Sequence, residues 1–569
     1  MRNLLTFILL ILFTVSCKNN NTPLKNASNE KIQGLVTNKA MVVSARVEAS
    51  QIGSDILEKG GNAYDAMVAT QLALAVVYPV AGNIGGGGFM VYRGNDGKTG
   101  ALDFREKAPL TSDRDMYLDK EGNVIPDKSS FGVHSVGVPG SIAGIFEVYN
   151  KFGSLPFKEL IQPSINMARD GFKVTAKQAK SLNGTRERFE KANNYKILFD
   201  KEWKEGDLLQ QEELAQTLER IRDNGQDGFY KGQTAKLFVD YVNELGGIIS
   251  FEDLAKYKAV WRKPIEISYK NHKIISMTLP ASGGICLAQI LKSIEPYDLS
   301  KIEHNSTKYV QLLTEAQRRS YADRAHYLGD IDFVDVPIDS LTDPTYINDR
   351  MSSFSWDKAT KSSEVSHGKI LGYESDETTH YSIIDQFGNA VSVTTTLNTG
   401  FGSKVLVKGA GFFLNNEMDD FSAKPGVPNV YGLLGSKANE IAPEKRMLSS
   451  MTPTIIEHNG KLKMVVGTPG GSTIITSVLQ NIVNVIDYNM GMQESVNKAR
   501  FHHQWMPDYI RMEPNGFDSI TKLNLNRLGY ELLERNSLII GRVDAILVLP
   551  DGKLEGGADK RGDDTAIGF

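Results

Sequence analysis

Residues 376–398, "DETTHYSIIDQFGNAVSVTTTLN", decide the fold because two predicted strands follow directly on a pair of threonines. Val391 and Val393 alternate with polar residues, which is typical of a strand with one buried face. Residues 385–389 are rich in turn-forming residues and predict the connection between the strands. The pair Thr378–Thr379 then either opens an ordinary strand or provides a nucleophile.

A threonine hydroxyl is a poor nucleophile near neutral pH and needs a base. His380 is close in sequence, but residues two apart on a strand share a face about 6.6 Å apart, which is poor hydrogen-bond geometry. A free α-amino group has a pKa of about 8 and is better suited. Thr378 gains such a group only if the chain is cut after Glu377, by attack of its own hydroxyl on the Glu377 carbonyl. We therefore expect self-cleavage at this bond, with His380 as a packed core residue.

The first residues, "MRNLLTFILLILFTVSC", have a basic start and an apolar run that is too short to span a bilayer comfortably. The cysteine that ends this run, Cys17, resembles the acylated residue of a bacterial lipoprotein signal, although Thr14 is less usual than leucine at its position. The sequence predicts a signal peptide over 1–16 and a lipidated flexible tether over 17–35. We expect an exported protein, a periplasmic or outer-membrane lipoprotein that meets the membrane only through this anchor. An ordinary signal peptide is the alternative.

The composition narrows the class of protein. A chain of 569 residues with 41 % apolar residues can form several domains or one large α/β unit. Its net charge of −4 gives no reason to expect a nucleic-acid partner. With Cys17 lipidated, Cys286 is the single remaining cysteine, so an intrachain disulfide is not expected. The histidines of "FHHQW" at 501–505 would point apart on a strand without carboxylates at ligand spacing, so we expect a structural role and no metal site.

The rest of the chain predicts a layered α/β architecture. Residues 49–79 predict two helices broken by a glycine pair, the second of them, over about 63–77, buried. Residues 140–370 resemble amphipathic helices, with a clear example over 207–225. Residues 357–373 are polar and predict an exposed segment where a chain break is plausible. Residues 461–488 predict a strand, a glycine turn and a helix that starts near Ser472.

Several motifs resemble those of γ-glutamyltranspeptidases, in the same order and with similar spacing. The resemblance covers nearly the whole chain after the tether. In the second half the motifs are "TTHYS" (378–382), "TLNTGFGS" (396–403), "NNEMDDFSAKPGVPNVYGL" (415–433), "RMLSSMTPTI" (446–455) and "GTPGGS" (467–472). In the first half they are "GGGGFMVY" (85–92), "LDFREKAP" (102–109), "GVPGS" (137–141) and "LPASGGI" (279–285).

The resemblance implies an α/β fold of the N-terminal-nucleophile hydrolase type, an αββα sandwich built by two fragments of one precursor. The large fragment would end at residue 377 (36–377 after the tether), and the small fragment, 378–569, would begin with the nucleophile. Thr378 would take the γ-glutamyl group of glutathione or another γ-glutamyl compound and pass it to water, an amino acid or a dipeptide. No metal or organic cofactor is implied.

The resemblance also implies roles for individual residues. Arg105, Ser449 and Ser450 would bind the α-carboxylate of the substrate, since an arginine fork suits a carboxylate. Its α-ammonium would meet Asn398, Glu417 and Asp420. Gly470 and Gly471 precede a helix and would stabilise the oxyanion, Thr396 would hydrogen-bond the nucleophile, and Tyr431 would close a lid formed by about 425–435.

Two other functions remain open at this point. A related acylase of the cephalosporin or glutaryl type would share the nucleophile and the fold. A non-catalytic binding lipoprotein would keep the fold alone. The residues implied for the α-amino acid group favour the γ-glutamyl reaction over the first, and the intact Thr378 and glycine pair weigh against the second.

Overall fold

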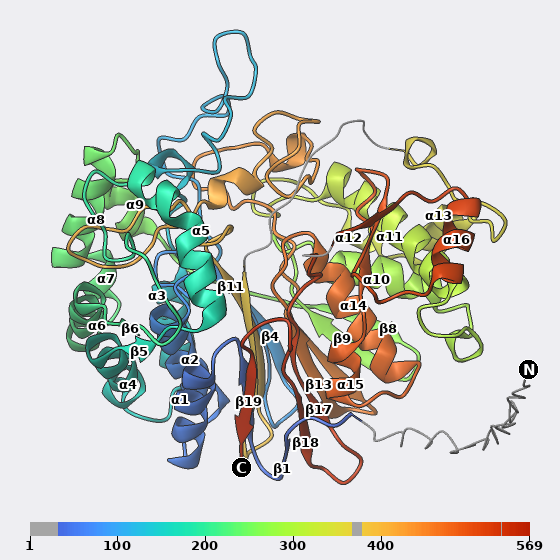
Figure 1. The fold of residues 1–569 in the computed structure, drawn as a ribbon, viewed down its shortest axis with the longest axis horizontal. Helices are drawn as coiled ribbons and strands as arrows, with labels where there is room; N and C mark the ends of the chain where they lie inside the picture. Colours follow the sequence, from blue (N-terminus) through green and yellow to red (C-terminus); the bar gives the residue numbers. More distant parts are fainter. Residues whose placement is uncertain (1–31, 367–377, 536–537) are drawn as a thin grey trace, which may run out of the picture. The chain divides into compact units, whose positions relative to one another are not determined.

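Strands β10 (Thr379–Ile384) and β11 (Ala390–Thr396) form the predicted pair, antiparallel and adjacent (Figure 1). They belong to the first of two large antiparallel sheets in this computed structural model, which describes residues 32–366, 378–535 and 538–569. The first sheet has the order β19 (Thr565–Gly568), β2 (Met41–Ser44), β10, β11, β3 (Gly87–Arg93), β4 (Thr99–Asp103) and β7 (Val260–Arg262).

The second sheet lies against the first. Its order is β1 (Val36–Thr37), β18 (Leu554–Gly557), β17 (Asp544–Val548), β13 (Lys461–Gly467), β12 (Thr454–His458), β9 (His272–Ser276) and β8 (Ile265–Tyr269). The described residues of 140–370 are mostly helical, as the sequence predicts, and β7, β8 and β9 are exceptions within that range. Each of these strands has only three to five residues. β7 pairs with β4 and β9 pairs with β12, and both partners lie far away in the sequence. Local periodicity therefore gives little signal for these strands.

The central strands of the first sheet, β2, β10 and β11, are buried on both faces. In β2, Val42 packs into the cluster formed with the first helical layer, whereas Met41 and Val43 pack into the cluster shared with the second sheet. This follows from the twofold alternation of side chains along a strand. The two sheets thus pack face to face and are covered by helices on their outer faces.

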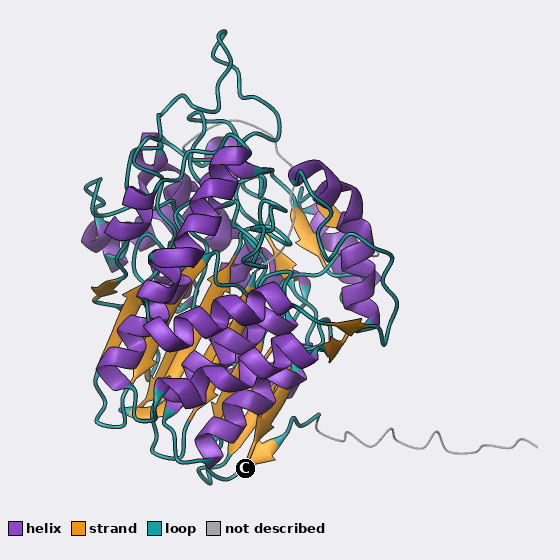
Figure 2. Cartoon of the chain, turned by 90° about the vertical axis from the view of Figure 1, so that its left-hand side faces the viewer, coloured by secondary structure: helices purple, strands orange, loops and turns teal. Residues whose placement is uncertain are grey.

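The helices form two outer layers (Figures 1 and 2). Those on the first sheet's side are α1 (Val47–Glu58), α2 (Ala63–Val77), α3 (Ser141–Phe152), α4 (Phe157–Asp170), α5 (Ala176–Ala192), α6 (Glu212–Asn224), α7 (Asp227–Tyr230), α8 (Gly232–Glu244) and α9 (Phe251–Lys256). Those on the second sheet's side are α10 (Gly283–Ile294), α11 (Thr307–Tyr327), α12 (Ile338–Leu341), α13 (Pro344–Met351), α14 (Thr473–Ile486), α15 (Met492–Asn497) and α16 (Ser519–Arg527).

The helix predicted over 207–225 starts five residues later than expected, at Glu212 of α6. Leu208 and Leu209 form the short strand β6, which pairs with β5 (Phe172–Lys173). A third small sheet holds β14 (Phe501–His502), β15 (Ile510–Met512) and β16 (Leu532–Glu534). The buried helix α2 and the helix after Ser472, which is α14, are confirmed.

Strands from before and after residue 378 alternate in both sheets. In the first sheet, β10 and β11 lie between β2 and β3, and in the second, the block β18, β17, β13 and β12 lies between β1 and β9. The predicted αββα sandwich is confirmed. A cut before Thr378 would leave two fragments joined by the hydrogen bonds of both sheets.

Among the helices of the described ranges, none combines the length and the apolar character needed to cross a bilayer.

Candidate active site

A pocket lies where β10 and β11 meet the turn that follows β13. All of the substrate-binding and catalytic residues expected from the sequence line it, except Gly470: Arg105, Thr378, Thr396, Asn398, Glu417, Asp420, Tyr431, Ser449, Ser450 and Gly471. Its remaining free volume is about 20 Å³, which is room for roughly one water molecule. A substrate must therefore displace side chains or the loop that covers the pocket.

Thr378 precedes β10 and is 3 % exposed. The antiparallel register pairs Thr379 with Thr395 and His380 with Thr394, so its continuation by one residue puts Thr378 opposite Thr396. The Thr396 hydroxyl oxygen accepts a hydrogen bond of 2.7 Å from the backbone N–H of Asn398. That bond leaves the Thr396 proton available to a neighbouring oxygen.

His380 is a buried core histidine, as the sequence predicts. Its ring nitrogens lie 2.9 Å from the Thr394 hydroxyl and 3.1 Å from the Ser382 hydroxyl. Burial lowers the pKa of His380 to about 3, so the ring is neutral at physiological pH. The ring packs against Gly467, where a β-carbon would lie 2.2 Å from it. Both ring nitrogens are engaged away from Thr378, which argues against His380 as its base.

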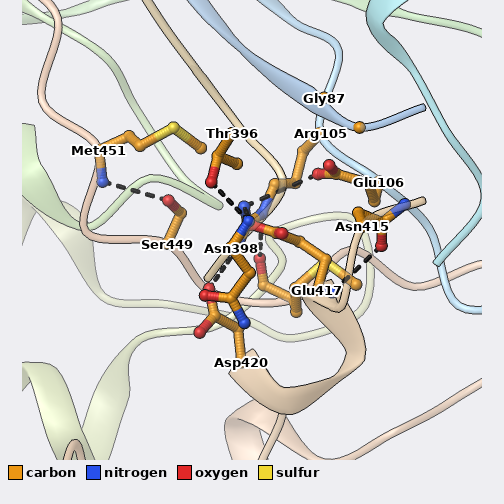
Figure 3. Close-up of polar contacts among 12 residues, drawn as sticks. Gly87, Arg105, Glu106, Thr396, Asn398, Asn415, Glu417, Asp420, Ser449 and Met451 are labelled. Atoms are coloured by element: carbon orange, nitrogen blue, oxygen red, sulfur yellow. Dashed lines mark hydrogen bonds and ion pairs between the residues drawn. The ribbon is translucent and has the colours of Figure 1, made fainter. Parts of the chain in front are cut away.

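Arg105 lies among three carboxylates (Figure 3). Its guanidinium donates to Glu417, and to Asp420 at 2.5 Å, while Glu106 is 3.7 Å away. Burial alone would lower the pKa of Arg105, but these negative charges raise it above its ordinary value. The charge of Arg105 is therefore already balanced inside the protein.

Burial raises the pKa values of Glu417 and Asp420, although the charge of Arg105 opposes the rise. Glu417 begins the short 3₁₀ turn Glu417–Asp420, and its backbone N–H donates to Asn415. The turn presents both carboxylates to the pocket. Two acidic groups held by one arginine suit a cationic group of a ligand.

Glu106 was not among the residues expected from the sequence. It is fully buried, and neither carboxyl oxygen has a hydrogen-bond partner among the described residues. Burial raises the pKa of Glu106 from 4.5 to about 8, so the group is largely protonated at neutral pH. The one feature of the sequence that could have pointed to Glu106 is its position next to Arg105 in "FREKAP".

This burial predicts a pH-dependent stability. Since the folded-state pKa of Glu106 is raised, its stabilising contribution is complete below pH 4.5 and is lost as the pH rises towards 8. Glu106→Gln cannot ionise, so its unfolding midpoint should fall less than that of the wild type between pH 5 and pH 8.5. Thermal unfolding of both proteins across this range measures the difference. Parallel curves would contradict the burial of an ionisable Glu106.

The two serines lie in the segment that follows Arg446. The Ser449 hydroxyl oxygen accepts from the Met451 N–H at 3.1 Å, and the Ser450 hydroxyl oxygen accepts from Arg324 Nη2 at 3.0 Å. Arg324, on α11, also lines the pocket and was missed by sequence reasoning. The sequence predicts this residue only as part of the helices over 140–370, so no local pattern distinguishes it.

The loop over 425–435, expected to be a lid, contributes Tyr431 and Leu433 to the lining of the pocket. The Tyr431 hydroxyl donates to the Asn398 carbonyl at 2.6 Å, and Gln504 donates to the Tyr431 carbonyl. Asn429 donates to Asp420, whereas Asp419 accepts from the backbone N–H of Val430 at 2.8 Å. Asp419 and Asp420 thus differ in their contacts: Asp420 lines the pocket, and Asp419 holds the backbone of the loop.

Gly470 and Gly471 form the turn before α14. Their φ angles of 134° and 52° favour glycine, and a β-carbon on Gly471 would lie 2.5 Å from the Tyr431 ring. Neither backbone N–H donates to a residue that the structure describes. Both lie at the N-terminal end of a helix, where negative charge is favoured.

The histidines of "FHHQW" have structural partners. His502 contacts Thr476 at 2.9 Å and Gln504 at 2.9 Å, and His503 contacts Asp508 at 3.2 Å. Across the described part of the chain, no group of three or more histidine, cysteine or acidic side chains has the geometry to hold a metal ion.

Several of the expectations concern residues outside the described ranges. Glu377 of the expected cleavage site and Cys17, the expected lipidation site, lie there, as do the expected signal peptide and most of the expected tether. The expected exposed segment 357–373 is described only up to residue 366.

Comparison with known proteins shows to which family the chain is related. Residues 49–569 match the family model of γ-glutamyltranspeptidase. The glutathione hydrolase proenzyme of Escherichia coli strain K12 is 47 % identical over 93 % of this chain and 92 % of its own length. A crystal structure of Helicobacter pylori γ-glutamyltranspeptidase has a TM-score of 0.56 and 44 % identity, and the match covers 60 % of this chain and 97 % of that one.

A cephalosporin acylase from Bacillus halodurans has a TM-score of 0.83 over 96 % of this chain and 99 % of its own. Its identity of 24 % shows a shared fold and nothing more specific. The family match and the high identity to the Escherichia coli protein are the more specific findings. The chain belongs to the γ-glutamyltranspeptidase family.

Proposed function

We propose that this protein is a self-processing γ-glutamyltransferase and glutathione hydrolase. It takes the γ-glutamyl group from glutathione or a similar compound and transfers it to water, an amino acid or a dipeptide. The observation that carries the proposal is one pocket shared by Thr378, two arginine-held carboxylates and two serine hydroxyls. Glutathione hydrolase is also the name of the Escherichia coli relative.

The first proposed step is self-cleavage. The Thr378 hydroxyl attacks the carbonyl carbon of Glu377, the peptide C–N bond breaks, and the hydroxyl proton passes to the freed amine. Water then hydrolyses the resulting ester, which restores the hydroxyl and leaves a carboxylate on Glu377. The products are a large fragment that ends at residue 377 and a small fragment, 378–569. The alternation of strands in both sheets supports their remaining together.

The second proposed step is acyl transfer. The new α-amine of Thr378, with a pKa of about 8, accepts the hydroxyl proton as the oxygen attacks the γ-carbonyl of the substrate. The N–H groups of Gly470 and Gly471 stabilise the oxyanion, and Thr396 hydrogen-bonds the nucleophile. The leaving amine takes the proton, and the acceptor then attacks the γ-glutamyl ester. The base, the oxyanion donors and the hydroxyl that hydrogen-bonds the nucleophile all belong to the chain itself.

Donor recognition follows from the charges of the pocket. Glu417 and Asp420, with the Asn398 side chain, receive the α-ammonium. Ser449 and Ser450 receive the α-carboxylate, on the side of the pocket where Arg105 lies. This double recognition favours an α-amino acid over the glutaryl group of a glutaryl acylase substrate, which lacks the ammonium.

Gel electrophoresis and a turnover assay test the proposal together. We expect two bands and release of p-nitroaniline from γ-glutamyl-p-nitroanilide. Two bands with faster turnover of glutaryl-p-nitroanilide would favour an acylase. A single band without turnover would favour a non-catalytic binding protein.

We also propose export and anchoring through an acylated Cys17. The apolar run that ends at this cysteine supports the proposal. In a bacterial host, radiolabelled palmitate should label the wild type and leave Cys17→Ser unlabelled, and the variant should leave the membrane fraction. Labelling of Cys17→Ser, or an unlabelled wild type, would contradict the anchor.

A further inference from the structure

Two cavities adjoin each other along helix α5, outside the catalytic pocket. The larger has a volume of about 500 Å³ and the smaller a volume of about 290 Å³, which together are in the usual range for small-molecule sites. Ser181, Gly184 and Thr185 of α5 and Phe401 line both cavities. Neither cavity shares a lining residue with the catalytic pocket. We call the two cavities together the α5 groove.

The larger cavity offers an apolar surface. Its lining includes the buried side chains of Val80, Val174, Leu182, Leu209 and Phe401. Free energy is gained when an apolar group displaces water from a surface of this kind. The larger cavity therefore suits the apolar body of a small molecule.

The smaller cavity holds a cation without an acidic partner. Arg188 lines it, and its guanidinium lies 5.0 Å from the centre of the Phe131 ring. This guanidinium forms no ion pair with a carboxylate in the described ranges. Ser130 and Ser181 also line the cavity, and their hydroxyls hydrogen-bond to none of the residues that the structure describes. An arginine fork beside hydroxyl donors suits a carboxylate.

The charges of the whole groove also favour an anion. Among the described residues, two acidic side chains line it, Asp127 and Asp563, against six cationic ones: Lys177, Lys180, Arg188, Lys404, Arg542 and Arg561. Four of the six have protein partners, namely Asp563, Thr399, Tyr78 and Glu513. Lys180 and Arg188 form no ion pair or hydrogen bond with a described residue. A cleft with this excess of positive charge attracts anions.

Gly184 leaves space in the groove. It lies inside α5 (Ala176–Ala192), where glycine is the least favourable residue after proline. A β-carbon on Gly184 would meet nothing within 4 Å, so close packing does not explain the glycine. Since Gly184 lines both cavities, a large side chain there would obstruct the passage between them. A helix-interior glycine without a packing role is what a ligand crossing at this point requires.

We propose that the α5 groove is a second ligand site that takes a small amphipathic carboxylate, with its apolar body in the larger cavity and its carboxylate on Arg188. Thr399 and Val430 line the smaller cavity, and their neighbours in sequence, Asn398 and Tyr431, line the catalytic pocket. Two sources share this chemistry: an acceptor with an apolar side chain and a carboxylate end, and a free carboxylate that takes no part in the reaction. Binding itself does not depend on the proposed γ-glutamyl reaction.

Isothermal titration calorimetry of the whole protein with 6-phenylhexanoate tests the site. A probe of about 14 non-hydrogen atoms should bind the wild type with a Kd of about 1 mM or lower. Arg188→Met should raise the Kd by about 10-fold or more, since a charged contact is lost. The uncharged analogue 6-phenylhexan-1-ol should bind both proteins equally. Arg186→Met is the matched control, because Arg186 is on the same helix, pairs with Asp200 at 3.0 Å and lines neither cavity.

Substitutions of Gly184 test the path between the cavities. Gly184→Phe should abolish binding of 6-phenylhexanoate, whereas Gly184→Ala should keep it. Neither variant should have a lower Tm than the wild type, because both residues favour a helix more than glycine does. A wild type that does not bind the probe, or equal Kd values in the wild type, Arg188→Met and Gly184→Phe, would overturn the site. If Gly184→Phe does not fold, Arg188→Met decides.

Transfer kinetics identify the source of the ligand, and this arm alone rests on the proposed function. If the ligand is an acceptor, Arg188→Met should raise the KM for the acceptor dipeptide Gly-Phe by about 10-fold and leave hydrolysis of γ-glutamyl-p-nitroanilide unchanged. If it is a free carboxylate, 6-phenylhexanoate should change the donor KM of the wild type and not that of Arg188→Met. Binding of the probe without either effect would overturn both sources. A wild type without turnover would refute the proposed function and leave the calorimetric test unaffected.

Discussion

Thr378→Ala is expected to remain a single polypeptide and to lose γ-glutamyl transfer by at least about 10³-fold. The hydroxyl is proposed both to cut the chain and to carry the acyl group, so its removal stops both events. Gel electrophoresis of the purified variant and p-nitroaniline release measure the two effects separately. The fold should persist, because the change removes a small side chain at the start of β10.

Thr379→Val is the matched control for this variant. The Thr379 hydroxyl is buried without a hydrogen-bond partner among the described residues, so an apolar side chain of similar shape should be tolerated. We expect normal processing and activity within a few-fold of the wild type. Two fragments from Thr378→Ala, or loss of processing in Thr379→Val alone, would contradict the assignment of the nucleophile.

Arg105→Met is expected to have the largest effect on stability. It leaves Glu106, Glu417 and Asp420 buried without their cation, and breaking a buried ion pair costs about 3–5 kcal/mol. The charge of Arg105 lowers the pKa values of all three carboxyls, so the loss should be greater at pH 8 than at pH 5, where they protonate more readily. Chemical unfolding at both pH values measures the change.

Arg114→Met is the control for Arg105→Met. Arg114 pairs with Asp115 at 2.8 Å on the surface, where ion pairs contribute little, so the variant should unfold at the same denaturant concentration as the wild type. A second variant, Arg105→Lys, keeps the charge but loses the two-pronged contact, and it should mainly raise KM. Equal stability of Arg105→Met and the wild type, or an unchanged KM in Arg105→Lys, would remove Arg105 from this network.

Local sequence patterns predicted the parts of the fold that have strong local signals. The pair β10 and β11, the buried helix α2 and the helix α14 are found where the sequence predicts them. Strands β7 and β9 were missed because they pair with β4 and β12, which are far away in the chain, and β8 was missed because it is a short edge strand that pairs only with β9. A short strand at the edge of a sheet has little pattern of its own.

The residues of the candidate site were likewise predicted only in part from the sequence. The residues gathered in the pocket were expected because collinear motifs marked them. Arg324 and Glu106 were not, since the burial of an arginine beside the pocket and of a carboxyl without hydrogen bonds are properties of the packed structure. The contacts of Arg105 with Glu417 and Asp420 join residues 312 and 315 positions apart in the sequence, which no local pattern reveals.

N-terminal sequencing of the smaller fragment tests the central claim most directly, because it examines the nucleophile and the cut site in one measurement. We predict that the fragment begins Thr-Thr-His-Tyr-Ser, with Thr378 as its first residue. A fragment that begins at any other residue, or a protein that yields no second N-terminus within its folded region while turning over γ-glutamyl substrate, would contradict catalysis by the α-amine and hydroxyl of Thr378.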